Sequence, residues 1–227
     1  MGMNNKYVSV WGRTLEEYTN MFGLNSIPCS IKILSIADGP STFNLQQRQR
    51  GINITSVDPI YNLSVTELEE AFKKSYSLNK EFFIENKANF NFKNELEMEQ
   101  ILARRQNTFK AFIADYEKYR SNYLFGKLPN LDLISNSFDM CLCSNLLFIF
   151  DHVFNLEFHI NSIKEMLRLS NEIRVFPLYN INGQESDYLN SVTEFLTENN
   201  YSWTIEINDY HIYKDGNRFL KVITLTE

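Results

Sequence analysis

The 227-residue sequence contains few glycines and no long apolar run. Glycine occurs eight times, so a glycine in a turn between two apolar segments is informative. No apolar stretch approaches the ~20 residues that span a bilayer, and the chain does not begin with a signal-peptide pattern. We therefore expect no membrane partner.

Cysteine is also scarce. Cys29, Cys141 and Cys143 are an odd number without the spacing of a disulfide framework. This usage is typical of a reducing cytoplasm, which is the predicted location. Cys141 and Cys143 share one face of a predicted strand, which resembles half of a metal site. Because no other ligand lies near them in the sequence, we interpret them as core thiols and expect no metal.

Basic residues are outnumbered by acidic ones, with 22 Lys and Arg against 28 Asp and Glu and a net charge of −6. This balance disfavours tight binding to a phosphate backbone, which usually needs a basic face. We therefore expect a small-molecule partner and no nucleic acid. Hydrophobic residues make up 44% of the chain. A compact unit of this length buries roughly 70% of its unfolded surface, so it needs no metal or disulfide to hold its core.

Predicted strands and helices alternate along most of the chain. Apolar runs predict strands at residues 31–36, 52–57, 123–125, 138–142, 172–176, 203–207 and 219–225. Capping residues and apolar periodicity predict helices at 14–22, from the turn after residue 41 to about 50, at 155–169 and at 187–199. Asp215 and Gly216 suit a tight turn before the last strand. This order predicts an α/β protein: a Rossmann-like three-layer α/β/α sandwich around a seven-stranded, mostly parallel sheet with an antiparallel edge strand.

Residues 1–227 are predicted to form a single domain, in which residues 63–122 are a helical cap inserted after the second strand. Ser64 and Glu67 form a capping box for the first of two long helices. The second helix carries one apolar stripe, formed by Met98, Leu102, Phe109, Phe112, Ile113 and Tyr116. Helical additions at a pocket mouth commonly cover a ligand. The alternative is a dimerisation surface, which would make the protein a homodimer.

The ends of the first two strands point to a ligand site. In open α/β sheets, ligands bind beyond the carboxyl ends of the strands. The first strand ends in a turn of small residues, Ala37-Asp38-Gly39-Pro40-Ser41, and the helix after it offers N–H groups to an anion. Asp58 closes the second strand, 19 positions after Gly39, where a carboxylate can accept hydrogen bonds from a ribose diol. The alternative for Asp58-Pro59 is a plain turn or helix cap.

Two phosphate-binding patterns are absent from the sequence. Neither G-x-G-x-x-G nor G-x-x-x-x-G-K-[ST] occurs, so a dinucleotide or P-loop site is disfavoured. A ligand with adenosine and no phosphate fits better, and S-adenosylmethionine (SAM) is such a ligand.

Three segments resemble motifs of the class I SAM-dependent methyltransferases: ILSIADGPSTF (33–43), SVDPIY (56–61) and FDMCLCSNLL (138–147). More narrowly, the chain resembles an uncharacterised bacterial subgroup of that family. The residues that carry this second resemblance are Trp11-Gly12-Arg13, the helix Glu17–Leu24, the GPSxFN turn, VDPIY, and RVFPL at 174–178. Together these motifs span nearly the whole chain.

The resemblance implies a SAM site. The turn Ala37–Ser41, with Asp38, Gly39 and Pro40, would cradle the methionine part, and Asp58 would hold the ribose. Adenine would lie beside Pro59-Ile60 and Lys127-Leu128, while Ser144 and Asn145 would face the sulfonium. Arg13 and Tyr18 would close the site, although Tyr18 could simply pack on the sheet.

The sequence departs from the family pattern at three positions. Ser35 replaces the usual acid of the first strand, where Asp38 could substitute, and Ala37 replaces a glycine. Lys127 replaces the acid that meets the adenine amino group, which leaves adenine recognition to backbone groups.

Methyl transfer needs an aligned nucleophile, exclusion of water and, for many acceptors, a base. The candidates at strand ends are Asn145, Tyr179, Asp151 and His152. We favour Asn145 and Tyr179, because they follow the fourth and fifth strands directly; the alternative is that they are pocket walls.

Other polar residues have structural explanations. Arg105 lies on the apolar stripe of the second long helix, where a charge is costly unless it is paired. It either forms a salt bridge or extends its stem towards solvent, or it is directed at an anionic group of the acceptor. His159 is predicted to be a core histidine, and His211 receives no role.

The predicted function is SAM-dependent transfer of a methyl group to a small-molecule acceptor. One alternative is a catalytically silent protein that senses SAM or S-adenosylhomocysteine, which Ser35 and Lys127 favour. Another is a dinucleotide-dependent reductase.

Overall fold

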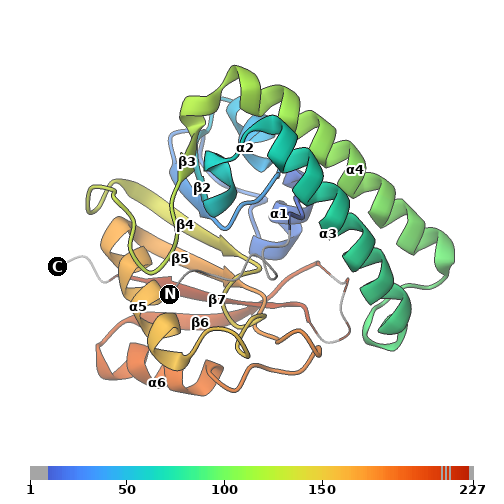
Figure 1. The fold of residues 1–227 in the computed structure, drawn as a ribbon. Helices are drawn as coiled ribbons and strands as arrows, with labels where there is room; N and C mark the ends of the chain where they lie inside the picture. The colour runs from blue at the N-terminus through green and yellow to red at the C-terminus, as the bar shows by residue number, and fades with distance from the viewer. Residues whose placement is uncertain (1–9, 211, 213, 215, 225–227) are drawn as a thin grey trace.

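The computed structural model describes residues 10–210, 212, 214 and 216–224. It contains a seven-stranded sheet in the order β3-β2-β1-β4-β5-β7-β6 (Figure 1). The strands are β1 Lys32–Ile36, β2 Asn53–Asp58, β3 Tyr123–Phe125, β4 Phe138–Ser144, β5 Ser170–Phe176, β6 Ser202–Ile207 and β7 Arg218–Ile223. β7 runs antiparallel to both of its neighbours, and the other pairs are parallel. The predicted fold class is confirmed, with the antiparallel strand lying next to the edge strand β6.

The helices are α1 Leu15–Phe22, α2 Phe43–Arg48, α3 Val65–Glu85, α4 Glu95–Lys118, α5 Leu156–Leu169 and α6 Leu189–Glu198, with short 3₁₀ helices at Pro59–Asn62, Lys87–Asn89 and Arg120–Asn122. α1 and α2 pack on one face of the sheet, and α5 and α6 pack on the other. The three layers of the predicted sandwich are therefore present.

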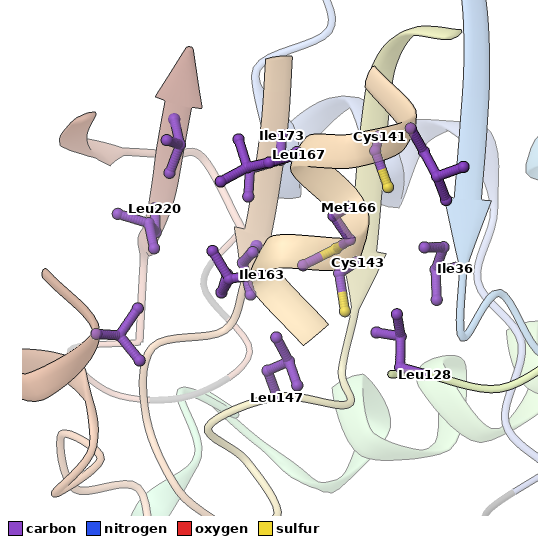
Figure 2. Close-up of a cluster of buried hydrophobic side chains, with 14 of the residues drawn as sticks. Ile36, Leu128, Cys141, Cys143, Leu147, Ile163, Met166, Leu167, Ile173 and Leu220 are labelled. Carbon is purple, nitrogen blue, oxygen red and sulfur yellow. The ribbon is translucent and has the colours of Figure 1, made fainter. Parts of the chain in front are cut away.

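β4 is almost continuously apolar because helices cover the sheet on both faces at this strand. Cys141 and Cys143 point into the cluster beneath α5 and α6 (Figure 2), and Met140 and Leu142 point into the cluster beneath α1. All four side chains are buried. Burial raises the pKa of both thiols, so they are core thiols, as predicted.

Local signals explain where several helices begin. Thr14 and Glu17 form a capping box at the start of α1, and Ser64 and Glu67 form another at the start of α3. Asn155 caps α5 through its side chain. Helix starts were therefore readable from short polar patterns.

Along the chain, the long helices α3 and α4 follow β2 and precede β3, and they lie side by side (Figure 1). Phe72 of α3 stacks on Phe109 of α4 with ring centroids 4.0 Å apart. The apolar stripe predicted for α4 faces α3 and the N-terminal segment, where Leu102 and Phe112 are buried.

Three predictions reach residues that the structure does not describe, namely the turn position Asp215, the residue His211 and the end of the last predicted strand at residue 225. In the part of the chain that is described, no helix combines the length and the apolar character that a membrane span needs.

Candidate functional site

The order of strands creates a switch point between β1 and β4, because the chain continues from β1 towards β2 and β3 and then returns to β4. A cavity of about 570 Å³ lies beyond the carboxyl ends of these strands. The ends of β1, β2, β4 and β5, the β3–β4 loop, α3 and the N-terminal segment all contribute to its wall. Ligands of open α/β sheets bind at this position.

Asp58 lines the cavity at the end of β2. Its Oδ2 accepts the N–H of Gly39 at 2.9 Å, and its Oδ1 accepts the N–H of Ile60 at 3.0 Å. Burial raises the pKa of Asp58 to about 6, although both hydrogen bonds lower it. Each carboxylate oxygen can accept a second hydrogen bond. The carboxylate therefore joins two strand ends and has capacity for a ligand with two hydroxyl groups.

Only part of the loop after β1 (residues 37–41) lines the cavity. Ala37 and Gly39 line the wall and have positive φ angles of 54° and 59°. A non-glycine residue rarely adopts this conformation, so Ala37 holds a strained position at the site. Pro40 and Ser41 are not among the residues of the wall.

The Asp38 side chain points away from the cavity and into a buried hydroxyl network. Its Oδ1 accepts hydrogen bonds from the hydroxyls of Tyr18 and Ser35, and its Oδ2 accepts one from Ser56. Burial raises the pKa of Asp38. Tyr18 also stacks on Phe43 at 4.3 Å, and neither Tyr18 nor Asp38 contributes to the wall. The expectations that Asp38 anchors a ligand amino group and that Tyr18 closes the site are therefore corrected.

The amides at the start of α2 are engaged within the protein. Thr42 N–H donates to the carbonyl of Arg13 at 3.0 Å, and Phe43 N–H donates to Ser41 Oγ at 2.9 Å. Ser41 Oγ in turn donates to the Arg13 carbonyl. Two of the amides at the start of α2 are therefore already bonded, one to the N-terminal segment and one to Ser41, and binding of an anionic tail by the amides of this region stays a prediction.

Gly12 allows this close approach. A Cβ atom at this position would lie 1.9 Å from the carbonyl oxygen of Pro40. Only glycine fits between the two backbones without displacing one of them. The N-terminal segment therefore lies directly on the loop after β1 and directs the Arg13 side chain into the cavity.

Arg13 and Asn145 both line the cavity and contact each other. Arg13 Nη2 donates to Asn145 Oδ1 at 2.8 Å, and Asn145 Nδ2 donates to Ser144 Oγ at 2.8 Å. Asn145 follows β4 directly with a positive φ of 54°. Arg13 Nε is buried and has no hydrogen-bond partner among the described residues. Arg13 therefore lines the cavity with a guanidinium that is held on one side by Asn145 and has unused donor capacity.

Arg105 lines the cavity but is held in an ion pair. Its Nη1 and Nη2 lie 2.6 and 2.5 Å from the two carboxylate oxygens of Glu17. The side chains are 1% and 2% exposed, respectively. Burial alone would raise the pKa of Glu17, but the charge and hydrogen bonds of Arg105 lower it to about 2. The Tyr210 hydroxyl donates to the same carboxylate at 3.2 Å. The salt bridge is therefore the correct interpretation, and the expectation that Arg105 binds an anionic acceptor group is corrected.

The structure places nine of the thirteen predicted cofactor residues on the wall, namely Arg13, Ala37, Gly39, Asp58, Pro59, Lys127, Leu128, Ser144 and Asn145. Tyr179 also lines the wall, where it is 6% exposed. Asp151 and His152 do not contribute to it. These two are therefore not brought to the site.

His159 is a satisfied core histidine, as predicted. Its Nδ1 lies 2.8 Å from the carbonyl oxygen of Asn155, and Phe148 N–H donates to its Nε2 at 3.1 Å. This pattern fits a neutral imidazole, and burial lowers its pKa. The described residues contain no group of three ligand side chains suited to a metal ion.

Sequence reasoning missed the aromatic part of the wall, to which Trp11, Phe82, Phe83, Phe150, Phe154 and Tyr210 contribute. A signal was present in α3. The apolar stripe at Leu68, Phe72 and Tyr76 continues at helical spacing to Asn79 and Phe83, and these last two residues reach the cavity.

Comparisons with known proteins come from sequence and from architecture. No protein-family model matches the chain. The uncharacterized protein MJ0045 of Methanocaldococcus jannaschii is 36% identical over 219 residues, which cover 96% of this chain and 97% of MJ0045. The chain belongs to the MJ0045 family. This relative is archaeal, and membership of a bacterial subgroup stays a prediction.

Several solved structures resemble the chain with TM-scores below 0.5. A SAM-dependent methyltransferase from Methanosarcina mazei is 12% identical, with 89% of this chain and 96% of that chain covered and a TM-score of 0.48. Magnesium protoporphyrin IX methyltransferase from Synechocystis PCC 6803, with bound S-adenosylhomocysteine, is 11% identical, with coverages of 86% and 74% and a TM-score of 0.47. A TehB-like SAM-dependent methyltransferase from Corynebacterium glutamicum is 10% identical, with coverages of 92% and 85% and a TM-score of 0.47. At these identities the similarity concerns the path of the chain and not the ligand or the reaction.

Proposed function

We propose that this member of the MJ0045 family is a SAM-dependent methyltransferase that acts on a small molecule. The observation that carries the proposal is the position of Asp58. Its carboxylate lines a cavity at the switch point of the sheet and is fixed by the loop after β1. A carboxylate at the end of the second strand is suited to a ribose diol.

The residues of the wall fit the parts of SAM. The free acceptor sites of Asp58 suit the two ribose hydroxyls. Pro59 and Leu128 offer apolar surfaces for the adenine ring. Arg13 lines the cavity and would offer its guanidinium to the carboxylate of the amino acid tail.

SAM supplies a methyl group that its sulfonium has already activated. The protein would then orient the two reactants and exclude water. Asn145 and Tyr179 lie at the ends of β4 and β5, where side chains can position an acceptor. The helices α3 and α4 would act as the cover, since Phe82, Phe83 and Arg105 close one side of the cavity.

Isothermal titration calorimetry with S-adenosylhomocysteine tests the proposal. We expect binding by the unmodified protein and at least a tenfold loss in Asp58→Ala, because the diol loses its charged acceptor. Asp132→Ala is the matched control, since Asp132 is exposed and does not line the cavity. Absence of heat from the unmodified protein, or equal affinity in Asp58→Ala, would contradict the proposed function.

A SAM-sensing protein without turnover is the second candidate. It is favoured by the composition of the wall, where the described residues include no histidine and a single carboxylate, that of Asp58. Incubation of cell extract with radiolabelled SAM separates the candidates: labelled product supports the enzyme, whereas tight binding of the nucleoside without any labelled product supports the sensor.

A further inference from the structure

Away from the ends of β1 and β2, the cavity is walled mainly by rings and aliphatic chains. α3 contributes Phe82 and Phe83, the segment after β4 contributes Phe150 and Phe154, and Trp11 lies on the N-terminal segment. Trp11 and Phe83 contact each other with ring centroids 6.1 Å apart. Such a wall favours a flat apolar molecule, because burial against rings is the main favourable contribution it can offer.

The charges around this part of the cavity are mostly positive. Of the four charged residues described on the wall, Arg13, Arg105 and Lys127 are basic and Asp58 is acidic. Arg105 is neutralised by its ion pair with Glu17. Arg13 forms no ion pair with any described residue. Lys127 forms none either, so two unpaired basic side chains share this wall with the single carboxylate of Asp58. A cationic acceptor would meet repulsion in this low-dielectric space, and an anionic acceptor would be stabilised.

The wall offers little to remove a proton from the acceptor. Among the described residues that form it, the single carboxylate is Asp58, which lies at the end of β2 and is bonded to Gly39 and Ile60. Burial raises the pKa of Tyr210, so its phenol stays protonated near neutral pH. An acceptor that ionises by itself needs no base from the protein.

We infer that the acceptor is a flat, apolar molecule with one acidic group, such as a thiol, phenol or carboxylic acid, that is ionised when it attacks. The inference rests on the proposed methyl transfer and names its substrate class. The acceptor loses its proton to solvent before it reacts. A lone pair of the resulting anion forms the bond to the methyl carbon, and the carbon–sulfur bond breaks. Its electron pair stays on sulfur, which becomes a neutral thioether.

Calorimetry with a series of probes on one ring system tests this substrate class. The protein is first saturated with S-adenosylhomocysteine and then titrated with 2-naphthoate, 2-naphthalenethiol or the cation 2-naphthylmethylammonium. We expect the naphthoate and the ionised thiol to bind at least tenfold more tightly than the cation.

Two variants of α3 sharpen the test. Phe82→Glu places a carboxylate on the aromatic wall and is expected to reduce or reverse the preference for anions. Ser77→Glu is the matched control, because it makes the same change of charge on an exposed position of the same helix. It is expected to leave the preference unchanged.

The outcomes separate this inference from the proposed function. Failure of S-adenosylhomocysteine to bind contradicts both. Binding of S-adenosylhomocysteine followed by equal or tighter binding of the ammonium probe, or by no binding of any probe, overturns the substrate class and leaves the proposed function standing. A methyl-transfer rate to the thiol that follows the ionised fraction of the thiol supports the inference. A rate set by a different titrating group overturns it.

Discussion

The backbone N–H of Gly39 donates a 2.9 Å hydrogen bond to Oδ2 of Asp58, and this contact joins the loop after β1 to the end of β2. Tyr61 reinforces the same loop, because its hydroxyl donates to the carbonyl of Gly39 at 2.7 Å. The geometry of the site is therefore set before any ligand arrives. A preformed acceptor of this kind reduces the entropy lost on binding.

The raised pKa of Asp58 predicts that nucleoside binding depends on pH. Burial raises this pKa to about 6, and a diol that donates two hydrogen bonds favours the ionised carboxylate. Affinity for S-adenosylhomocysteine should therefore be highest above pH 7 and fall as the pH drops through 6, by roughly tenfold at pH 5. Calorimetry across this range measures the effect. Asp58→Asn should bind weakly at every pH and lack this dependence; an unchanged profile would assign the titration to another group.

Replacing Arg13 by Met should weaken ligands that carry the amino acid tail and spare those without it. S-Adenosylhomocysteine has a carboxylate that the Arg13 guanidinium would bind, and 5′-methylthioadenosine lacks the whole tail. We expect the former to lose roughly tenfold or more in affinity, as expected for one charge-assisted hydrogen bond, and the latter to be little changed. Arg50→Met, on an exposed position, is the control. Equal losses for the two ligands would indicate a general disturbance of the cavity.

Removal of Arg105 should destabilise the fold, because it leaves the buried carboxylate of Glu17 without its charged partner. Arg105→Met is expected to lower the free energy of unfolding by about 3–5 kcal/mol in urea titrations. The double variant Arg105→Met with Glu17→Gln should recover part of this loss. A stable Arg105→Met protein that binds the nucleoside but has lost turnover would instead place Arg105 in acceptor binding.

The contribution of the Arg105–Glu17 ion pair to the free energy of unfolding should depend on pH. The pKa of Glu17 is lowered to about 2 in the folded protein. Its contribution to stability is therefore complete above the unfolded pKa, near 4, and is lost as the pH falls towards 2. Acid titration of Glu17→Gln should lack this component of the unfolding curve.

Tyr18→Phe should affect stability and spare ligand binding. The substitution removes one of the three hydroxyls that donate to the buried Asp38, at an expected cost of about 1.5–3 kcal/mol. Because Tyr18 does not reach the cavity, the dissociation constant of S-adenosylhomocysteine should change by less than twofold. Tyr119→Phe, at a side chain that is 40% exposed, is the control for stability. If Tyr18→Phe kept its stability but lost most of its affinity for S-adenosylhomocysteine, Tyr18 would have to contribute to the binding site.

The layers of the fold could be predicted from the sequence, because the patterns that mark strands and helix starts each lie within a few neighbouring residues. Alternating apolar runs marked the strands, and pairs such as Thr14 with Glu17 marked helix starts. The position of Asp58 also followed from a local pattern, since the end of a strand fixes which edge of a parallel sheet a residue reaches.

Contacts over long sequence separations could not be predicted. Asp38 could be placed in the loop after β1, but the direction of its side chain depends on Tyr18 and Ser56, which belong to α1 and β2. Likewise, Arg105 was recognised as a costly charge, but its partner lies 88 residues away. Local patterns indicate that a buried charge needs a partner and do not say which residue supplies it.

The position of β7 has a consequence for synthesis on the ribosome. β7 is the last strand of the sheet along the chain, yet it lies between β5 and β6. β6 therefore has no neighbour to pair with while it emerges, and it joins the sheet only after residues 218–223 have left the exit tunnel. A nascent chain stalled before that point would present the open flanks of β5 and β6 to chaperones.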